Sequence, residues 1–319
     1  MTLDTESRPK AFQLTSPGGR VSATVVPSMG GVLSGLELDG YGELLYRAND
    51  FAPVDAGEWT GRGPVLWPVV GRTYPLVPTA DTDPTKLKLG WRNEHGAWPM
   101  PIHGFARSLP WRMITMGANY EVATLTMELT DSAESQRFYP YSFVLRATWR
   151  VDDYGLEQAV QVRSRDDIRF GLGNHLTLAI RDGASFDSVS LRTSASSRLQ
   201  VNRFGLLDEA KIPLEARDGV PLTEPWTLNG ALLGGRDGWV EVRQAAGPIV
   251  RVSHTVTDGL SMGRPEDHLF VLYGRPDRGF YCPEPWLGRP NGLQTGSGCV
   301  NLPRNTQFEW KMRIDLEGL

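Results

Sequence analysis

The chain has 319 residues, of which 40% are hydrophobic, and its formal net charge at pH 7 is −4. This length suits one large all-β domain or two smaller ones, and the weakly negative charge argues against a nucleic-acid partner. Residues 1–10 are polar, so they predict a flexible start and not a secretory signal. No apolar run approaches the roughly 20 residues that cross a bilayer. We therefore expect a cytoplasmic protein without a membrane partner.

The cysteine and histidine content limits metal and disulfide chemistry. The two cysteines, Cys282 and Cys299, are too few for a disulfide scaffold or a zinc site. They could pair, but two free thiols in a cytoplasmic chain are the simpler interpretation. No two of the five histidines have a ligand spacing with a partnering cysteine or carboxylate, so we expect no metal ion.

Alternation of hydrophobic and polar residues with a period of two is the dominant signal. Residues 123–130, 143–151 and 307–316 each place hydrophobic side chains at every second position, which predicts half-buried β-strands. Residues 152–155 are turn formers, and residues 156–163 repeat the pattern after them, so this pair predicts a β-hairpin.

The rest of the chain adds little helix and no boundary. One short helical turn is expected near residues 131–137, and residues 75–100, with four prolines and mixed charge, predict a long surface loop. Glycines and prolines are scattered, without a linker or a repeat. We therefore expect one domain over residues 1–319, folded as a large antiparallel β-sandwich.

A constrained glutamate stands in the segment Phe-Tyr-Cys-Pro-Glu-Pro-Trp-Leu-Gly, residues 280–288. Proline fixes its own φ and restricts the residue before it, so Glu284 lies on a stiff, extended segment. Trp286 follows two positions later and therefore projects to the same side. A carboxylate beside an aromatic face suits a sugar site. The alternative is a strand end whose glutamate faces water.

Two histidines stand beside glycines in stretches that interrupt the alternation. His103 precedes Gly104, and His175 follows Gly173 and Asn174 on an otherwise apolar segment. A single such histidine is usually a satisfied core or edge residue, but two of them together with the constrained Glu284 favour a functional site. The other three histidines occupy loop-like or alternating contexts and are expected to face solvent: His95, His254 and His268.

An apolar strand, residues 64–71, ends in a glycine followed by Arg72. The guanidinium is permanently charged and offers a planar fork of donors, which suits the binding of oxygen-rich ligands. The alternative is an arginine that pairs with a carboxylate at the strand end.

Together these motifs resemble the aldose 1-epimerase family, also called galactose mutarotases. Four segments occur in the family's order: Pro-x-Leu-x-Pro-x-x-Gly-Arg at 64–72, His-Gly-Phe at 103–105, a glycine-rich strand that leads to His175, and Glu-Pro-Trp at 284–286. Residues 27–33 and 139–143 also resemble family segments, so the resemblance extends from about residue 12 to residue 316.

The resemblance implies a many-stranded antiparallel supersandwich and an isomerase that interconverts the α and β anomers of a sugar without a cofactor. By position, Glu284 would be the general base at the anomeric hydroxyl and His175 the general acid at the ring oxygen. His103 would position the sugar or assist at the ring oxygen, Arg72 would bind hydroxyls, and Trp286 would line the site. The expected partner is a small sugar, and the expected state is a monomer or weak dimer.

The chain departs from the family pattern near His175 and at one binding residue. Leu176-Thr177-Leu178 follows His175 where galactose-type members carry an aromatic pair. The family's substrate-binding aspartate has no clear counterpart, and its position falls near Asn229 or near Asp237.

The His-Gly-Phe-Ala-Arg form also resembles hexose-6-phosphate 1-epimerases, in which arginines meet the phosphate. Arg107 would serve that role, and a good phosphate site needs a second arginine nearby. Arg92 or Arg289 could supply it.

Two further functions remain open. A catalytically silent sugar-binding protein would not need Glu284, His175 and His103 together. A glycan-degrading enzyme normally needs two carboxylates that flank the bond, and the sequence offers one in a constrained motif. The isomerase is therefore the leading hypothesis.

Overall fold

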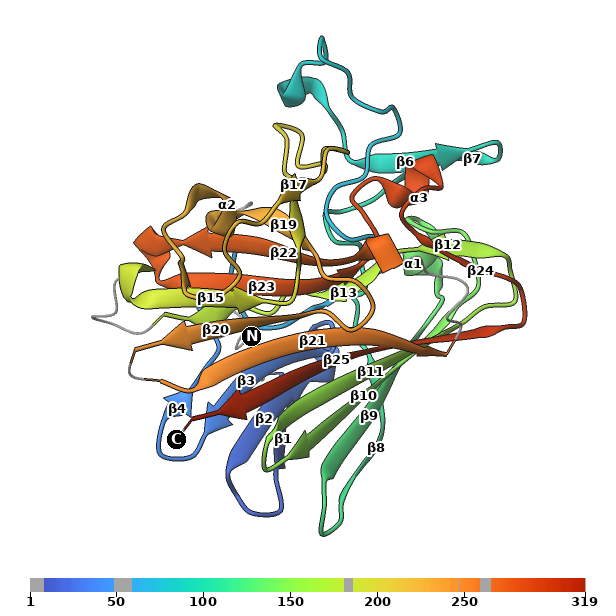
Figure 1. Cartoon of the computed structure of the whole chain (residues 1–319). Helices are drawn as coiled ribbons and strands as arrows, with labels where there is room; N and C mark the ends of the chain where they lie inside the picture. The colour runs from blue at the N-terminus through green and yellow to red at the C-terminus, as the bar shows by residue number, and fades with distance from the viewer. Residues whose placement is uncertain (1–8, 49–58, 181–185, 246, 259–264, 319) are drawn as a thin grey trace, which may run out of the picture.

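The computed structural model describes residues 9–48, 59–180, 186–245, 247–258 and 265–318 (Figure 1). Strands dominate, and the α-helices among these residues are three single turns: α1 (Ala133–Gln136), α2 (Pro225–Leu228) and α3 (Gly292–Thr295). The expected all-β class is confirmed, and α1 is the short helix expected near residues 131–137. The prediction of a flexible start falls mostly on residues 1–8, outside the described residues.

The largest sheet has nine antiparallel strands. Their order across the sheet is β18 (Val220–Pro221), β15 (Val189–Thr193), β20 (Trp239–Gln244), β21 (Ile249–Asp258), β25 (Gln307–Glu317), β11 (Gly155–Arg163), β10 (Val144–Asp152), β9 (Ala123–Thr130) and β8 (Arg112–Ala118). The four strands predicted from alternation, β9, β10, β11 and β25, agree with these bounds to within one residue.

One face of this sheet is buried over most of its width. In β25 the side chains of Phe308, Trp310, Met312 and Ile314 are fully buried, and the cross-strand partners of Ile314 on β11 and β21 are buried too. The intervening residues of β25 are partly exposed. The sheet therefore has one apolar and one polar face, as the period-two pattern predicted.

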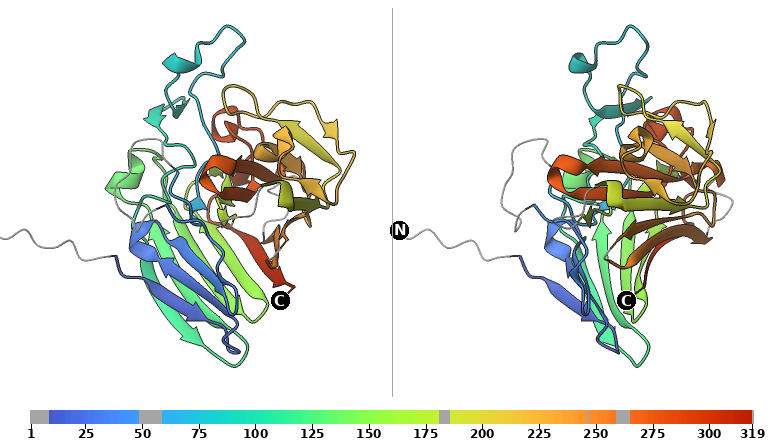
Figure 2. Two further views of the ribbon diagram at one scale, coloured as in Figure 1. Left: turned by 90° about the vertical axis from the view of Figure 1, so that its left-hand side faces the viewer. Right: turned by 60° about the vertical axis from the view of Figure 1, so that its left-hand side comes forward.

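Two smaller sheets pack on the apolar face (Figure 2). The first pairs β1 (Phe12–Thr15), β2 (Val21–Val26), β3 (Val32–Leu38) and β4 (Gly42–Glu43), and it contacts β9 and β10. The second orders β17 (Ile212–Pro213), β16 (Ser197–Gln200), β19 (Asn229–Leu233), β22 (His268–Arg275), β23 (Phe280–Leu287), β13 (Leu172–Asn174) and β5 (Val65–Leu66), with β14 (Leu178–Ala179) also on β23. Side chains from all three sheets share one hydrophobic cluster.

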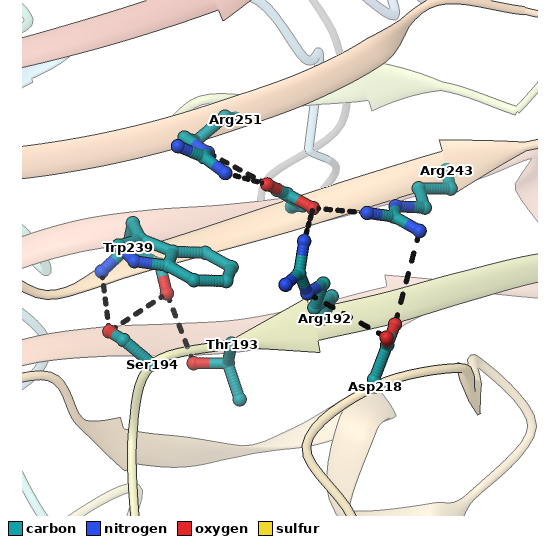
Figure 3. A network of polar contacts seen from close by, with 8 residues as sticks. Arg192, Thr193, Ser194, Asp218, Trp239, Arg243 and Arg251 are labelled. Atoms are coloured by element: carbon teal, nitrogen blue, oxygen red, sulfur yellow. Dashed lines mark hydrogen bonds and ion pairs between the residues drawn. The ribbon is translucent and has the colours of Figure 1, made fainter.

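The polar face of the nine-stranded sheet carries paired charges (Figure 3). Glu241 on β20 is 1% exposed, and its carboxylate accepts hydrogen bonds from Arg243 Nη2 (2.8 Å) and Arg251 Nε (2.7 Å). Arg192 Nη1 lies 3.6 Å from the same carboxylate. The Arg192 and Arg251 guanidinium groups also lie over the Trp239 ring, 5.3 and 4.6 Å from its centroid. The arginine side chains that pair with the Glu241 carboxylate therefore also shield it from water.

The long loop expected at residues 75–100 is only partly a loop. Residues 90–99 form a hairpin of β6 (Gly90–Asn93) and β7 (Gly96–Pro99). Trp91 and Trp98 stack across it with centroids 4.8 Å apart, and Trp91 is buried. This aromatic pair supplies the packing that a polar loop would lack. A second small pair, β12 (Ile168–Phe170) and β24 (Val300–Leu302), lies nearby in Figure 1.

Two of the three histidines expected to face solvent are buried between the sheets. His254 is 2% exposed and His268 is 1% exposed, with ring centroids 5.2 Å apart, whereas His95 is exposed as expected. The prediction was wrong because His254 alternates in phase with the buried Val252 and Val256 on β21. The strand period therefore places it inside, and Trp310 Nε1 donates to its Nδ1 over 3.0 Å.

Candidate active site

The site forms where strand pairing along β23 is interrupted. On one side β22 pairs with the whole of β23. On the other side β14 pairs at residues 280–281 and β13 at residues 286–287. The stretch between, residues 282–285, contains Pro283 and Pro285, which have no N–H for a sheet ladder. The chain between β13 and β14 leaves the sheet at this interruption, and it carries His175.

Glu284 and His175 meet at this interruption. His175 Nε2 lies 3.4 Å from Glu284 Oε1, and Trp286 Nε1 donates to Glu284 Oε2 over 3.1 Å. Both side chains are almost fully buried. Two groups that the sequence placed about 110 residues apart therefore share one contact, as expected for an acid–base pair that serves one ligand.

His103 stands beside this pair on a strained turn. Its φ is 66° and that of Gly104 is 74°. A Cβ on Gly104 would lie 2.0 Å from the carbonyl oxygen of Trp67, so this position requires glycine. His103 Nδ1 accepts a hydrogen bond from Gly71 N over 3.1 Å. In the neutral ring the proton is therefore on Nε2, which is free to donate. The His103 ring meets His175 edge-on, with centroids 5.1 Å apart.

A pocket of about 740 Å³ opens over these residues. Every binding residue predicted from the sequence lines it: Arg72, Arg107, Asn229 and Trp286. Arg107 Nε is buried without a hydrogen-bond partner among the described residues. Arg72 is exposed and packs over Gly205. It forms no ion pair with a described carboxylate, so the strand-end alternative finds no support.

Three alternative assignments do not fit this pocket. Asp237 lines a separate hollow beside β21, so of the two positions considered for the family aspartate, Asn229 is the one at the pocket. Arg92 lines another hollow, beside β6. Arg289 pairs with Asp267, with Nε 3.3 Å from Oδ1, and with Glu209. Local sequence does not show how the connecting loops run, so it could not distinguish these positions from the residues at the pocket.

Sequence analysis missed several lining residues, among them Trp59, Arg203 and Tyr273. Arg203 donates through Nη2 to the carbonyl oxygens of Ala80 and Thr82, so it links the loop after Arg72 to the pocket rim. These residues carry no motif signal, because they lie on loops or on a strand that otherwise appears ordinary. Three arginines, Arg72, Arg107 and Arg203, therefore line the pocket.

Burial sets the electrostatics of the pair. Loss of water raises the pKa of Glu284 well above its ordinary value, against the lowering effect of the Trp286 N–H. Burial lowers the pKa of His175 well below its ordinary value, and His103 and Arg107 add to the shift. The pKa of His103 falls to about 3 because of burial and of the charges on Arg107 and Arg72. Burial therefore favours the neutral carboxylic acid of Glu284 and the neutral imidazole of His175 over the ion pair of carboxylate and imidazolium.

A third donor lies close to the pair. Cys282, His175 and Glu284 place one potential ligand atom each within 4.8 Å of one another, a set that could hold a metal ion. Spacing in the sequence did not reveal it because the members come from two separate segments. Burial and the neighbouring Glu284 raise the pKa of the Cys282 thiol, and its Sγ lies 3.6 Å from Thr177 Oγ1. The thiol is therefore disfavoured as the thiolate that metals bind.

Comparison with known folds gives the class of protein. Over 99% of both chains, the structure resembles that of the Slr1438 protein from Synechocystis sp. PCC 6803, with 20% identity and a TM-score of 0.74. It also resembles a galactose 1-epimerase from Lactobacillus acidophilus NCFM, with 16% identity and a TM-score of 0.70 over 99% of this chain and 97% of that one. The fold is the galactose mutarotase-like supersandwich, as predicted.

The sequence comparisons then give the family. Residues 11–241 match the family model described as aldose 1-epimerase, and the chain belongs to this family. A candidate glucose-6-phosphate 1-epimerase of Escherichia coli (strain K12) is 44% identical over 52 residues, which are 16% of this chain and 18% of that protein. No helix within the described ranges is long and apolar enough to cross a membrane.

Proposed function

We propose that the protein interconverts the α and β anomers of a sugar by acid–base ring opening. The observation that carries the proposal is the contact between Glu284 and His175, 3.4 Å apart inside a pocket of about 740 Å³. Membership of the aldose 1-epimerase family supports it. A pocket of this size admits a monosaccharide together with ordered water.

The reaction needs one proton removed and one delivered. In the tautomer with Glu284 as carboxylate and His175 as imidazolium, which has the same number of protons as the uncharged pair, Glu284 takes the proton of the anomeric hydroxyl and His175 gives one to the ring oxygen. The bond between the anomeric carbon and the ring oxygen then breaks and an open-chain aldehyde forms. Rotation about the bond between the first two carbons exposes the other carbonyl face. Ring closure reverses both proton transfers, and the enzyme returns to its starting state. Each positioned group contributes about a hundred- to ten-thousand-fold.

The buried environment suits this exchange. Desolvation raises the pKa of Glu284 and lowers that of His175, so it opposes the separation of charge that these groups would adopt in water. Each group can then hold the proton in one of the two tautomers, and a reversible reaction requires both. His103, with its proton on Nε2, donates to a sugar oxygen, and Trp286 offers an aromatic face. Neither a cofactor nor a metal ion takes part.

The arginines favour an anionic sugar as the second candidate substrate, such as a hexose 6-phosphate. Arg72, Arg107 and Arg203 line the pocket, and Glu284 is the only carboxylate among the described lining residues. Three guanidinium groups outnumber this one carboxyl in either of its protonation states, so the net charge of the described lining is positive, which suits a phosphate. The name of the Escherichia coli relative agrees with this substrate class.

Competing functions fit the pocket less well. A glycan-degrading enzyme needs two carboxylates at the bond, and the described lining residues supply one. A silent binder has no use for a buried acid–base pair, whose uncharged forms cost stability at neutral pH. We also infer a cytoplasmic location, since both cysteines are free thiols, and a monomer or weak dimer.

The test follows anomer exchange by NMR for glucose, galactose and their 6-phosphates, first with the parent and then with Glu284→Gln. The amide keeps the shape and cannot take a proton at neutral pH, so we expect turnover to fall at least about a hundredfold while sugar affinity changes little. His175→Asn should behave alike. An inactive parent that still binds sugar would favour the silent binder. An active parent whose Glu284→Gln variant keeps most of its rate would refute the base assignment.

Substrate class is tested separately. We expect Arg107→Met to lower kcat/KM for the 6-phosphates about tenfold or more, because a charge-assisted hydrogen bond is lost, and to leave free sugars less affected. Arg92→Met, outside the pocket, is the matched control. Equal losses for free and phosphorylated sugars would exclude a phosphate role for Arg107.

A further inference from the structure

The indole of Trp59 lies flat on the imidazole of His175, with centroids 3.7 Å apart and planes inclined by 25°. The indole is itself fixed, because its Nε1–H donates to Thr177 Oγ1 over 3.0 Å. The Thr177 hydroxyl in turn donates to the carbonyl oxygen of His175, 3.1 Å away. One hydroxyl therefore connects the stacked indole to the backbone of the residue that the indole covers.

The segment between β13 and β14 places Thr177 for this role. It follows His175 by two residues, and its hydroxyl reaches both the Trp59 N–H and the carbonyl oxygen of His175. Thr177 is fully buried, and it is absent from the described residues that line the pocket, whereas Trp59 is among them. A substitution at Thr177 therefore alters the support of the indole without removing a group that a sugar would touch.

The imidazole of His175 lacks the usual anchor. A functional histidine is commonly oriented by a hydrogen bond at the ring nitrogen that does no chemistry. His175 Nδ1 is buried and makes no hydrogen bond to another described residue. No hydrogen bond from Nδ1 to another described residue therefore fixes the rotation of the ring. Packing must do so, through the Trp59 stack on one face and the His103 ring edge-on at 5.1 Å.

We propose that Trp59, held by the Thr177 hydroxyl, is a positioning residue for His175. The stack keeps His175 Nε2 directed at Glu284, 3.4 Å away, and shields one ring face from water. This inference rests on the proposed function, because it assigns a role within that reaction. Small errors in placement matter, since a displacement of about 1 Å can lower a rate about a hundredfold.

The test compares three single variants of the full-length protein. Thr177→Val keeps the shape and removes the hydroxyl, Thr177→Ser keeps the hydroxyl, and Trp59→Phe keeps a stacking ring and removes the N–H. We expect kcat about tenfold lower in Thr177→Val and in Trp59→Phe, at nearly unchanged KM for the Thr177 variant, as loss of one hydrogen bond predicts. Thr177→Ser should retain the parental kcat.

The double variant Trp59→Phe/Thr177→Val decides whether the two residues act together. Both changes remove the same hydrogen bond, so the double variant should be no slower than the slower single one. Multiplied losses would overturn the proposal, and so would a parental kcat in both single variants. If Thr177→Val fails to fold, Trp59→Phe still provides the comparison with the parent.

An NMR measurement separates this inference from the proposed function. The indole ring should shift the Cε1–H signal of His175 upfield, and that signal is assigned by its loss in His175→Asn. We expect Thr177→Val to move it and Thr177→Ser to leave it in place. A parent that binds sugar without converting it refutes the proposed function, and the signal still decides whether the stack fixes the ring. An active parent whose signal and kcat are unchanged in Thr177→Val refutes the positioning role alone.

Discussion

The two imidazoles buried between the sheets predict a loss of stability in mild acid. His268 and His254 face each other at 5.2 Å. Burial and the charge of Arg236 lower the pKa of His268 to about 4, against a smaller raising effect of Asp237. Burial also lowers the pKa of His254 well below its ordinary value, and His268 adds to that shift. Both side chains are therefore neutral in the folded protein at neutral pH.

The sign and the size follow from proton linkage. The unfolded chain, with a histidine pKa of about 6.5, binds a proton more readily than the folded chain does. The stability from neutral His268 is fully present above pH 6.5 and is lost as the pH falls toward 4. With the folded pKa of His268 at about 4, linkage gives a loss of about 2 kcal/mol between pH 7 and pH 5. His254 acts in the same direction.

The assay is urea unfolding of the parent and of His268→Gln at pH 7, 6 and 5. Glutamine does not titrate, so the free energy of unfolding of the variant should fall by about 2 kcal/mol less than that of the parent across this range. The opposite pH dependence expected from Glu284 is common to both proteins and cancels in the difference. His95→Gln, at an exposed position, is the control. Parallel stability curves for parent and His268→Gln would refute the reasoning.

Three other substitutions test separate parts of the structure. Glu241→Gln removes the charge that three arginines share, and because about a third of each arginine side chain stays in water we expect a loss of about 1 kcal/mol in urea unfolding; an unchanged midpoint would show that water replaces the lost pairing. Gly104→Ala should cause a large loss of activity and only a small fall in the melting temperature, since its Cβ would lie 2.0 Å from Trp67 O and displace His103. Full activity would mean that the turn adapts. Glu284→Asp should turn over at a rate between parent and Glu284→Gln, because a shorter side chain moves the base out of line; a rate as low as that of the glutamine variant would show that reach matters as much as charge.

Sequence was informative wherever local periodicity decided the structure. β9 and β25 were predicted to within one residue because each strand has one buried face, which the period of two records directly. His254 was mispredicted because its phase in β21 indicates burial, whereas histidine as a residue type more often faces solvent. The hairpin at residues 90–99 was missed because its packing comes from Trp91 and Trp98, whereas the surrounding prolines indicated a loop.

The residues of the candidate site also divide into those that a local sequence pattern predicts and those that it does not. Glu284, His175 and His103 were found because proline and glycine beside a polar residue leave a local mark in the sequence. Trp59 and Arg203 leave none, since each reaches the pocket only through the path of a loop. The sequence favoured Arg92 or Arg289 as the second arginine of a phosphate site, because it does not show which loops approach the pocket. Contacts between residues distant in the chain depend on tertiary packing, which the sequence does not record in any local pattern.

The two prolines of β23 connect these observations. A central strand normally pairs on both sides, and Pro283 and Pro285 lie where only β22 is paired. The residues that stiffen the backbone around Glu284 are thus also the residues that cannot complete the ladder. The neighbouring chain leaves the sheet at that interruption, and the segment that leaves carries His175. One local feature therefore both holds Glu284, the proposed base, and admits His175, the proposed acid, at the same interruption in the sheet.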